Sequence, residues 1–477
     1  MKVRKRFSLV EVLAAAAILG IVGATIAAFG TGLTTSSERD RPGTTPASTP
    51  GPTLTPAPAP SPTSAPSPAP TPAPVPVAGW IHQFGSPAWD KANGLAVDGE
   101  GDVIIVGATQ GAMPGQTLGG FWDGFARKLS PAGAEMWTLQ YTNSVSVGAL
   151  SVAVDAAGDI ILAGHVQGEL PGQTGAGNDD AYVRKLSPAG TEVWTHQTGS
   201  ADADWAFAAA VDGSGDIVAA GAANAALAGQ TGTGGEDAFV QKLSPEGTEL
   251  WTSQFGSDAS DRVWSAAVDG SGNIIVVGRT QHALPGQTSA GSWDAFVRKY
   301  SPEGTQLWSL QFGSPAPDVA NKVVVDGAGN IIVAGSTMGA LPGQTRAGYD
   351  DAFVRKLSPE GKELWTLQFG TAASADASGL AVDRAGNIIV AGRVYGALPG
   401  QTQVGQQDVY VRKLSPAGIE LWTLQFGSPA SDEVVGVAVD STGNIFVAGN
   451  TQGALPGQSN AGDWDSFIVR VNQPSAS

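Results

Sequence analysis

Histidines and acidic residues are the side chains of this 477-residue chain that could carry catalysis or bind a metal. The four histidines lack the spacing of a ligand set; they are His82, His165, His196 and His282. Seven aspartates recur in the pattern V-D-x-x-G; they are Asp98, Asp155, Asp212, Asp269, Asp326, Asp383 and Asp440. A calcium loop needs further acidic residues after the first, whereas D-G-S-G-N offers a hairpin turn. The sequence therefore predicts no metal, no cofactor and no catalytic residue.

The aspartates belong to a repeat whose step is 57 residues. The same step separates seven tryptophans, which are Trp80, Trp137, Trp194, Trp251, Trp308, Trp365 and Trp422. It also separates seven copies of a phrase related to D-A-F-V-R-K, the first at Asp123 and the last at Asp465. Residues 79–477 hold seven such units without an insertion or deletion. Internal repeats of this length indicate a repeat architecture.

Each unit contains four short apolar or alternating runs bounded by Gly, Pro and Asp, which is typical of β-strands. Four antiparallel strands repeated seven times predict an all-β, seven-bladed β-propeller with four-stranded blades. The first unit opens with a single strand near Trp80, and the last ends after its third strand. We therefore expect residues 79–86 to complete blade seven, which also removes two exposed sheet edges.

The pattern A-V-D-x-x-G-N-I-I-V-A-G, followed by D-A-F-V-R-K-L-S-P-x-G and a tryptophan strand, resembles the bacterial SBBP repeat. The resemblance covers residues 79–477 and implies a propeller of the kind found mostly in exported proteins. It implies no reaction, because that family has no defined catalytic residues. The phrase S-P-x-G-x-x-L-W is also weakly similar to the tryptophan-docking motif of quinoprotein dehydrogenases.

The N-terminal region predicts export and tethering. A basic cytoplasmic segment, residues 1–6, precedes a transmembrane signal-anchor helix over 7–33, because Val12–Leu33 is long enough to span a bilayer and carries no charge. Phe7 and Glu11 match the spacing of the processing motif of type IV pilins, although Arg6 stands where that family has Gly. A cleaved signal peptide, which would leave a secreted protein, is the alternative. Residues 34–78 form a disordered linker, since 14 of the 37 residues from 42 to 78 are proline.

Charge and cysteine content exclude some classes of function. The chain has no cysteine and therefore no thiol chemistry. Its net charge is −17, and the propeller carries 20 basic against 40 acidic side chains. Such a surface repels nucleic acids and anionic lipid headgroups, so nucleic-acid binding is excluded and only the N-terminal helix is expected to contact a membrane.

The units differ mainly in two connectors. One joins the fourth strand to the first strand of the next unit, and the other joins the second strand to the third. Connectors alternate ends in an antiparallel meander, so both sets are expected on one face of the propeller. The six tryptophans outside the 57-residue series fall in these connectors, and Tyr349 lies there too. The predicted ligand-binding residues are Trp89, Trp122, Trp205, Trp264, Trp293, Trp464 and Tyr349.

These observations predict a membrane-tethered, extracytoplasmic propeller that binds a cell-surface or extracellular glycan or protein and is not an enzyme. One alternative is a pilin-like subunit that displays the propeller on a filament. Another is an enzyme with its site at the mouth of the propeller. That enzyme would need polar groups peculiar to one unit, and we expect no such break in the symmetry.

The predicted topology can be tested with protease added to intact cells. Cleavage should occur within residues 42–78 and release a compact fragment the size of the 399-residue repeat region. A deglycosylated sample is the control, because sugars on the Ser and Thr of the linker could block cleavage. A propeller that becomes cleavable only after cell lysis would place it in the cytoplasm and contradict the expectation.

Overall fold

The structure, a computed structural model, describes residues 77–143 and 145–472. The predicted transmembrane helix and the pilin-like residues Arg6, Phe7 and Glu11 lie outside them, as does nearly all of the predicted linker. Within the described ranges every regular element is a strand. These ranges therefore contain no helix that could cross a membrane.

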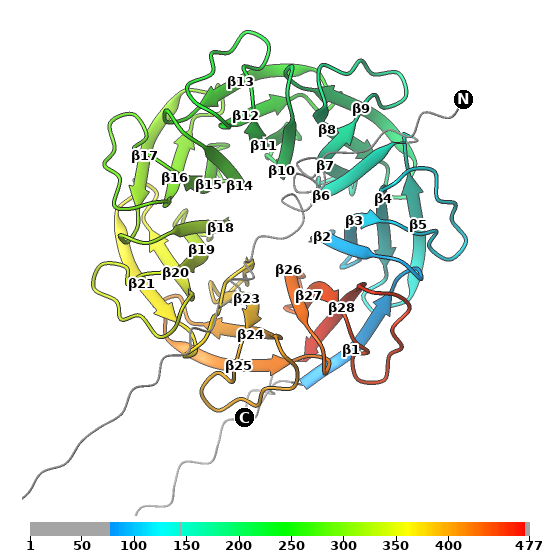
Figure 1. The fold of residues 1–477 in the computed structure, drawn as a ribbon, viewed down its shortest axis with the longest axis vertical. Coiled ribbons are helices and arrows are strands. Elements are labelled where there is room, and N and C mark those ends of the chain that lie inside the picture. The colour runs from blue at the N-terminus through cyan, green and yellow to red at the C-terminus, as the bar shows by residue number, and fades with distance from the viewer. Residues whose placement is uncertain (1–76, 144, 473–477) are drawn as a thin grey trace, which may run out of the picture. The chain divides into compact units, whose positions relative to one another are not determined.

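Seven four-stranded antiparallel sheets stand around one axis, which confirms the predicted seven-bladed propeller (Figure 1). The innermost strands are β2 (Asp90–Val97), β6 (Ser146–Val154), β10 (Asp204–Val211), β14 (Asp261–Val268), β18 (Asp318–Val325), β22 (Gly379–Val382) and β26 (Asp432–Val439). The second strands are β3 (Val103–Thr109), β7 (Ile160–Gln167), β11 (Ile217–Ala223), β15 (Ile274–Thr280), β19 (Ile331–Thr337), β23 (Ile388–Val394) and β27 (Ile445–Thr451). Blades are numbered one to seven in this order.

The outer half of each blade repeats the same regularity. The third strands are β4 (Asp123–Leu129), β8 (Asp179–Leu186), β12 (Asp237–Leu243), β16 (Asp294–Tyr300), β20 (Asp351–Leu357), β24 (Asp408–Leu414) and β28 (Asp465–Asn472). The outermost strands of blades one to six are β5 (Glu135–Tyr141), β9 (Glu192–Thr198), β13 (Glu249–Phe255), β17 (Gln306–Phe312), β21 (Glu363–Phe369) and β25 (Glu420–Phe426). The outermost strand of blade seven is β1 (Val77–Phe84), which pairs antiparallel with β28.

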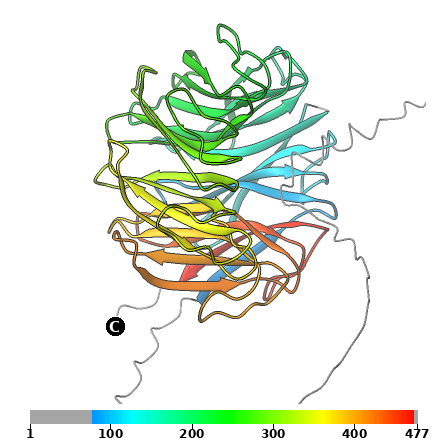
Figure 2. The same cartoon turned by 60° about the vertical axis from the view of Figure 1, so that its left-hand side comes forward.

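The core of the propeller lies between blades. Neighbouring sheets pack face to face (Figure 2), and the described residues form seven apolar clusters, each shared by two adjacent blades. Second and third strands are covered on both faces, so they read as nearly continuous apolar runs. The cluster between blades seven and one contains Phe84 from β1 and Phe125 from β4. No blade can therefore bury its faces alone.

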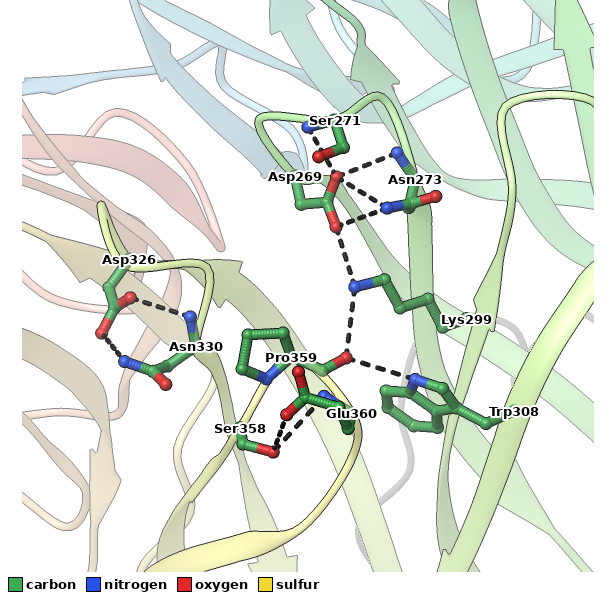
Figure 3. Close-up of polar contacts among 10 residues, drawn as sticks. All are labelled: Asp269, Ser271, Asn273, Lys299, Trp308, Asp326, Asn330, Ser358, Pro359 and Glu360. Carbon is green, nitrogen blue, oxygen red and sulfur yellow. Dashed lines mark hydrogen bonds and ion pairs between the residues drawn. The ribbon is translucent and has the colours of Figure 1, made fainter.

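One face of the ring holds the V-D-x-x-G-N and S-P-x-G turns, and we call it the constant face. As predicted, the Asp269 carboxylate accepts from the backbone N–H groups of Ser271 and Asn273, and Gly272 has a φ of 79°. The second carboxylate oxygen of Asp269 lies 2.8 Å from Lys299 Nζ (Figure 3). The turn aspartates of blades one to six are each paired with a lysine in this way, whereas Asp440 of blade seven accepts from Thr442 and Asn444.

The same network joins neighbouring blades on this face (Figure 3). The carbonyl of Pro359, in blade five, accepts from Lys299 Nζ at 3.2 Å and from Trp308 Nε1 at 3.3 Å, both in blade four. Gly361 follows with a φ of 82°, and a Cβ there would approach the Trp308 ring to 3.2 Å. We call this arrangement of Asp, Lys, Trp and Pro carbonyl the inter-blade clamp. Its tryptophan-to-proline contact recurs at the other blade junctions up to Trp365–Pro416.

The opposite face holds both sets of connectors. Hydrogen bonds that recur from blade to blade anchor these connectors. In blade four the Asp294 carboxylate accepts from Ala290 N–H and from Gln311 Nε2. The Gln311 amide oxygen accepts from Leu284 N–H, and its backbone N–H donates to the side chain of Gln287 in the P-G-Q-T phrase. These contacts explain why half of the connector between second and third strands has a constant sequence.

In five blades a second aspartate, the first residue of the innermost strand, anchors the other connector. Asp204 accepts from the backbone N–H and hydroxyl of Ser200. Burial raises the pKa of Asp204 to about 7, with the neighbouring Asp180 charge adding to the rise. Burial likewise raises the pKa of Asp318 and of Asp432 to about 6. These carboxyl groups are therefore more basic in the folded chain than in the unfolded one.

We expect ring closure by β1 to determine stability. A chain that begins at Ser86 lacks β1, which exposes the edge of β28 and removes Phe84 from the cluster between blades seven and one. Loss of one buried aromatic side chain alone costs about 3–5 kcal/mol, so the melting temperature should fall by many degrees. A chain that begins at Gly79 is the control. Equal melting temperatures for the two chains would contradict closure by this strand.

The raised pKa values predict that stability depends on pH. The pKa is 3.8 in the unfolded chain and about 6 to 7 in the folded chain for three carboxyl groups, those of Asp204, Asp318 and Asp432. Because the folded chain holds these protons more tightly, the groups contribute their full stability below pH 4, and this contribution is lost as the pH rises through 7. The melting temperature should therefore be higher at pH 5.5 than at pH 8. Asp204→Asn, which cannot ionise, should reduce this difference. A melting temperature that stays constant between these pH values in the unmodified chain would refute the assignment.

Candidate binding face

The two sets of connectors meet along every blade boundary, and we call the surface that they form the variable face. Trp89 precedes β2, and its carbonyl accepts from Gln110 N–H at the start of the next connector of the same blade. Asp90 N–H donates to the carbonyl of Trp464, in the connector before β28 of blade seven. Equivalent backbone contacts recur at other boundaries, such as Val147 to Trp122 and Asp318 to Trp293. Each boundary therefore presents loops from two blades side by side.

Exposed large apolar side chains fall into two groups. Six are equivalent positions on the outermost strands, immediately before the repeat tryptophan; they are Met136, Val193, Leu250, Leu307, Leu364 and Leu421. With the turn residue Ile419 set aside, the others all lie in the connectors of the variable face; they are Trp89, Leu118, Phe121, Val145, Tyr349, Tyr395 and Val404. The second group follows no seven-fold pattern and is concentrated where blades one, two, five and six meet the variable face.

The predicted ligand-binding residues are not equally available. Trp89 is 37% exposed and Tyr349 is 64% exposed, whereas Trp464 is buried. Trp122 and Trp293 are half-buried. The structure brings Trp89 and Trp464 together at the boundary of blades seven and one, with Lys91 Nζ 4.8 Å from the Trp464 ring centre.

Trp205 and Trp264 are not in connectors, and this part of the prediction is wrong. They belong to the innermost strands β10 and β14, at the end of each strand that adjoins the variable face. Trp205 is buried and Trp264 half-buried. These two innermost strands begin earlier than expected because the buried aspartate that anchors the connector, Asp204 or Asp261, is itself the first strand residue.

A further set of side chains, not predicted from the sequence, lies where these strands reach the variable face. We call three series of equivalent residues the rim positions. The first series, on or just before the innermost strands, is Lys91, Gly148, Trp205, Arg262, Val319, Asp376 and Glu433. The second series, on the second strands, is Ala108, His165, Ala222, Arg279, Ser336, Arg393 and Asn450. The third series, at or next to the start of the third strands, is Trp122, Asp179, Glu236, Trp293, Asp350, Gln407 and Trp464. Each series keeps the 57-residue step but changes residue type, so polar groups peculiar to single units do occur, contrary to the expectation stated above.

Most charges at the rim positions are neutralised by a neighbour. Arg393 contacts the Asp376 carboxylate and lies 3.6 Å from Glu433. Lys91 lies 3.8 Å from Glu433 across the boundary of blades seven and one. Asp350 faces Asp376, and its burial together with the Asp376 charge raises the pKa of Asp350 to about 7. The charged side chains at the rim positions of blades five, six, seven and one therefore largely neutralise one another.

The boundary of blades three and four is different, because it combines cations with aromatic rings. We call this group the arginine–tryptophan cluster. It consists of Trp205, Phe207, Glu236, Arg262, Trp264, Arg279 and Trp293. The Arg279 guanidinium lies 4.3 Å from the Trp293 ring centre, and the Arg262 guanidinium lies 4.9 Å from that of Trp264.

In the part of the chain that the structure describes, no group of three or more His, Cys, Asp or Glu side chains is arranged to hold a metal. Burial lowers the pKa of His82, His165 and His196. His282 pairs through Nδ1 with Asp258 on the surface.

A known repeat family matches one short stretch of the chain, and two known proteins are distantly similar to longer parts of it. The family described as SBBP, beta-propeller repeat, matches residues 421–456, which run from the outermost strand of blade six into blade seven. The chain is 24% identical over 409 residues to the regulatory protein FlaEY of Caulobacter vibrioides, an alignment that covers 77% of this chain and 40% of that protein. It is 23% identical over 211 residues to the uncharacterized WD repeat-containing protein L264 of Acanthamoeba polyphaga mimivirus, covering 36% of this chain and 15% of that protein. This chain thus spans less than half of either relative.

Similar solved structures include two WD40 domains. The WD40 β-propeller domain of Doa1 is 13% identical, with a TM-score of 0.46, and covers 82% of this chain and 97% of its own. The Pan2 WD40 domain of Neurospora crassa is 12% identical, with a TM-score of 0.45, and covers 83% of this chain and 96% of its own. The matched repeat recurs in register through all seven units of the sequence. The chain folds as a seven-bladed β-propeller, and one of its units matches the SBBP repeat.

Proposed function

We propose that this protein is a non-catalytic binding module whose variable face captures a glycan or protein outside the cytoplasm. The observation that carries the proposal is the distribution of exposed apolar side chains. Those that break the seven-fold pattern, such as Trp89, Phe121 and Tyr349, lie in the connectors of one face. Exposed aromatic residues with polar neighbours are typical of recognition surfaces.

The two faces have different physical roles in this proposal. On the constant face the turn Asp, the Lys and the repeat Trp side chains bind one another or a proline carbonyl in the inter-blade clamp, which repeats with little change from blade to blade. The connectors of the variable face are fixed at their bases by buried aspartates and glutamines, while their outer residues differ from blade to blade. Variable loops on a rigid scaffold are a common arrangement for binding proteins.

The tether is a further part of the proposal. A basic segment, an apolar run and a proline-rich linker would anchor the propeller to a membrane and hold it away from the surface. A relative whose name is regulatory protein is consistent with recognition of a partner and says nothing of a reaction in this chain.

The proposal can be tested with the full chain on arrays of glycans, peptides and secreted proteins. Replacing Trp89, Phe121 and Tyr349 together by Ala should reduce capture of the array ligand at least tenfold, because each stacked ring contributes about 0.5–1.5 kcal/mol beyond its buried area. The melting temperature should change little, since these side chains are 37%, 69% and 64% exposed.

A matched control removes equally exposed apolar side chains from the outer strands. Leu307 and Leu364 are 50% and 51% exposed, and replacing both by Ala should leave capture unchanged. If the outer-strand variant loses capture and the variable-face variant retains it, the binding surface lies on the rim of the outer strands and the proposal is wrong.

A further inference from the structure

The arginine–tryptophan cluster places two like charges directly opposite each other. Arg262 on β14 and Arg279 on β15 are cross-strand partners. Like charges in this position destabilise a sheet. Blade six provides an internal comparison, because there Arg393 lies beside the Asp376 carboxylate of the first rim series. A carboxylate at position 262 would neutralise Arg279 in the same way, yet the chain has an arginine.

The cluster has an uncompensated positive charge. The Glu236 carboxylate forms an ion pair with Arg262, and both side chains are mostly buried, 10% and 17% exposed. Arg279 has no ion pair within the described ranges and is held there by the rings of Trp264 and Trp293. Burial and the Arg262 charge lower the pKa of Arg279 to about 10, so it stays charged at neutral pH. The cluster therefore has an excess of one positive charge on a strongly acidic protein.

The buried polar atoms of this cluster that lack a partner are all hydrogen-bond donors. They are Nε1 of Trp205, Nε1 of Trp264 and Nε of Arg279, each without an acceptor among the residues that the structure describes. Trp205 itself is only 8% exposed. A buried donor without an acceptor costs free energy, and three of them beside an excess cation match a ligand rich in acceptor oxygens.

We infer that the arginine–tryptophan cluster binds the carboxylate of an acidic sugar, a uronic acid. A carboxylate forms strong charge-assisted hydrogen bonds with guanidinium groups, and sugar hydroxyls accept from indole N–H groups. Aromatic side chains beside the arginines offer apolar surface to the carbon–hydrogen face of a pyranose ring. An acidic peptide also offers acceptor oxygens, but it lacks the carbon–hydrogen face of a pyranose ring that could stack against these tryptophans.

The inference rests on the proposed function in that it assigns a ligand class to part of the variable face, but it can be tested separately. The full chain is titrated with glucuronate, with uncharged glucose and with N-acetylglutamate, and binding is followed by calorimetry and by tryptophan fluorescence. Glucuronate should bind and quench fluorescence, glucose should bind at least tenfold more weakly, and N-acetylglutamate should bind more weakly than glucuronate. Tighter binding of N-acetylglutamate than of glucuronate would replace the sugar by an acidic peptide and overturn the inference.

Arg279→Gln distinguishes a binding site from a structural contact. It should weaken glucuronate binding by about 10- to 100-fold, the loss expected for one charge-assisted contact, and Arg279→Lys should restore part of it. The melting temperature should stay equal or rise, because the variant removes a like-charge pair. Arg384→Gln, an exposed arginine on the constant face, is the control and should bind normally. Unchanged glucuronate binding by Arg279→Gln would overturn the inference. If glucuronate binds but the arrays of glycans, peptides and proteins return no ligand, the result counts against the proposed function alone.

Discussion

The inter-blade clamp is the interaction on which the rest of the structure depends. A blade of this protein has two apolar faces and cannot bury them without neighbours, and the clamp fixes how neighbours stack. A lysine held by the turn aspartate of its own blade donates to a proline carbonyl of the next, and a tryptophan donates to the same carbonyl. Burial opposes ionisation of Asp269, but the hydrogen bonds from Lys299 and Asn273 still lower its pKa. The charged network is therefore stable at neutral pH although its members are mostly buried.

Because the clamp fixes the constant face, the opposite face is free to vary. The buried aspartates and glutamines at the bases of the connectors satisfy backbone N–H groups, so the outer parts of the loops can change without loss of the fold. The same logic explains the rim positions, where an innermost strand keeps its backbone pairing while its side chains differ in every blade. Seven equal scaffolds thus present seven different local surfaces.

Much of this fold could be predicted from the sequence, because period, turn chemistry and strand pattern all indicate the same architecture. The Asp269 turn and the positive φ of Gly272 follow from the local sequence alone. The inter-blade contact between Trp308 and Pro359 could not be predicted, since it joins residues 51 apart through packing. The constancy of the tryptophan indicated its importance but not its partner.

The candidate site was less predictable. Trp89 and Tyr349 were found by their residue type and by their place in variable connectors, and both are exposed. Arg262 and Arg279 were missed because each is unremarkable in its own unit, and only cross-strand pairing brings them together. Reading each position down the 57-residue step would have revealed the change from Lys91 to Glu433.

The central claim, that one face maintains the fold and the other binds, is tested most directly by hydrogen exchange of the full chain with and without its captured ligand. The account predicts slower exchange on binding in the connectors, such as residues 199–203, 256–260 and 281–293, and unchanged exchange in the turns around Asp269 and Pro359. Slower exchange in those turns, with no change in the connectors, would contradict it.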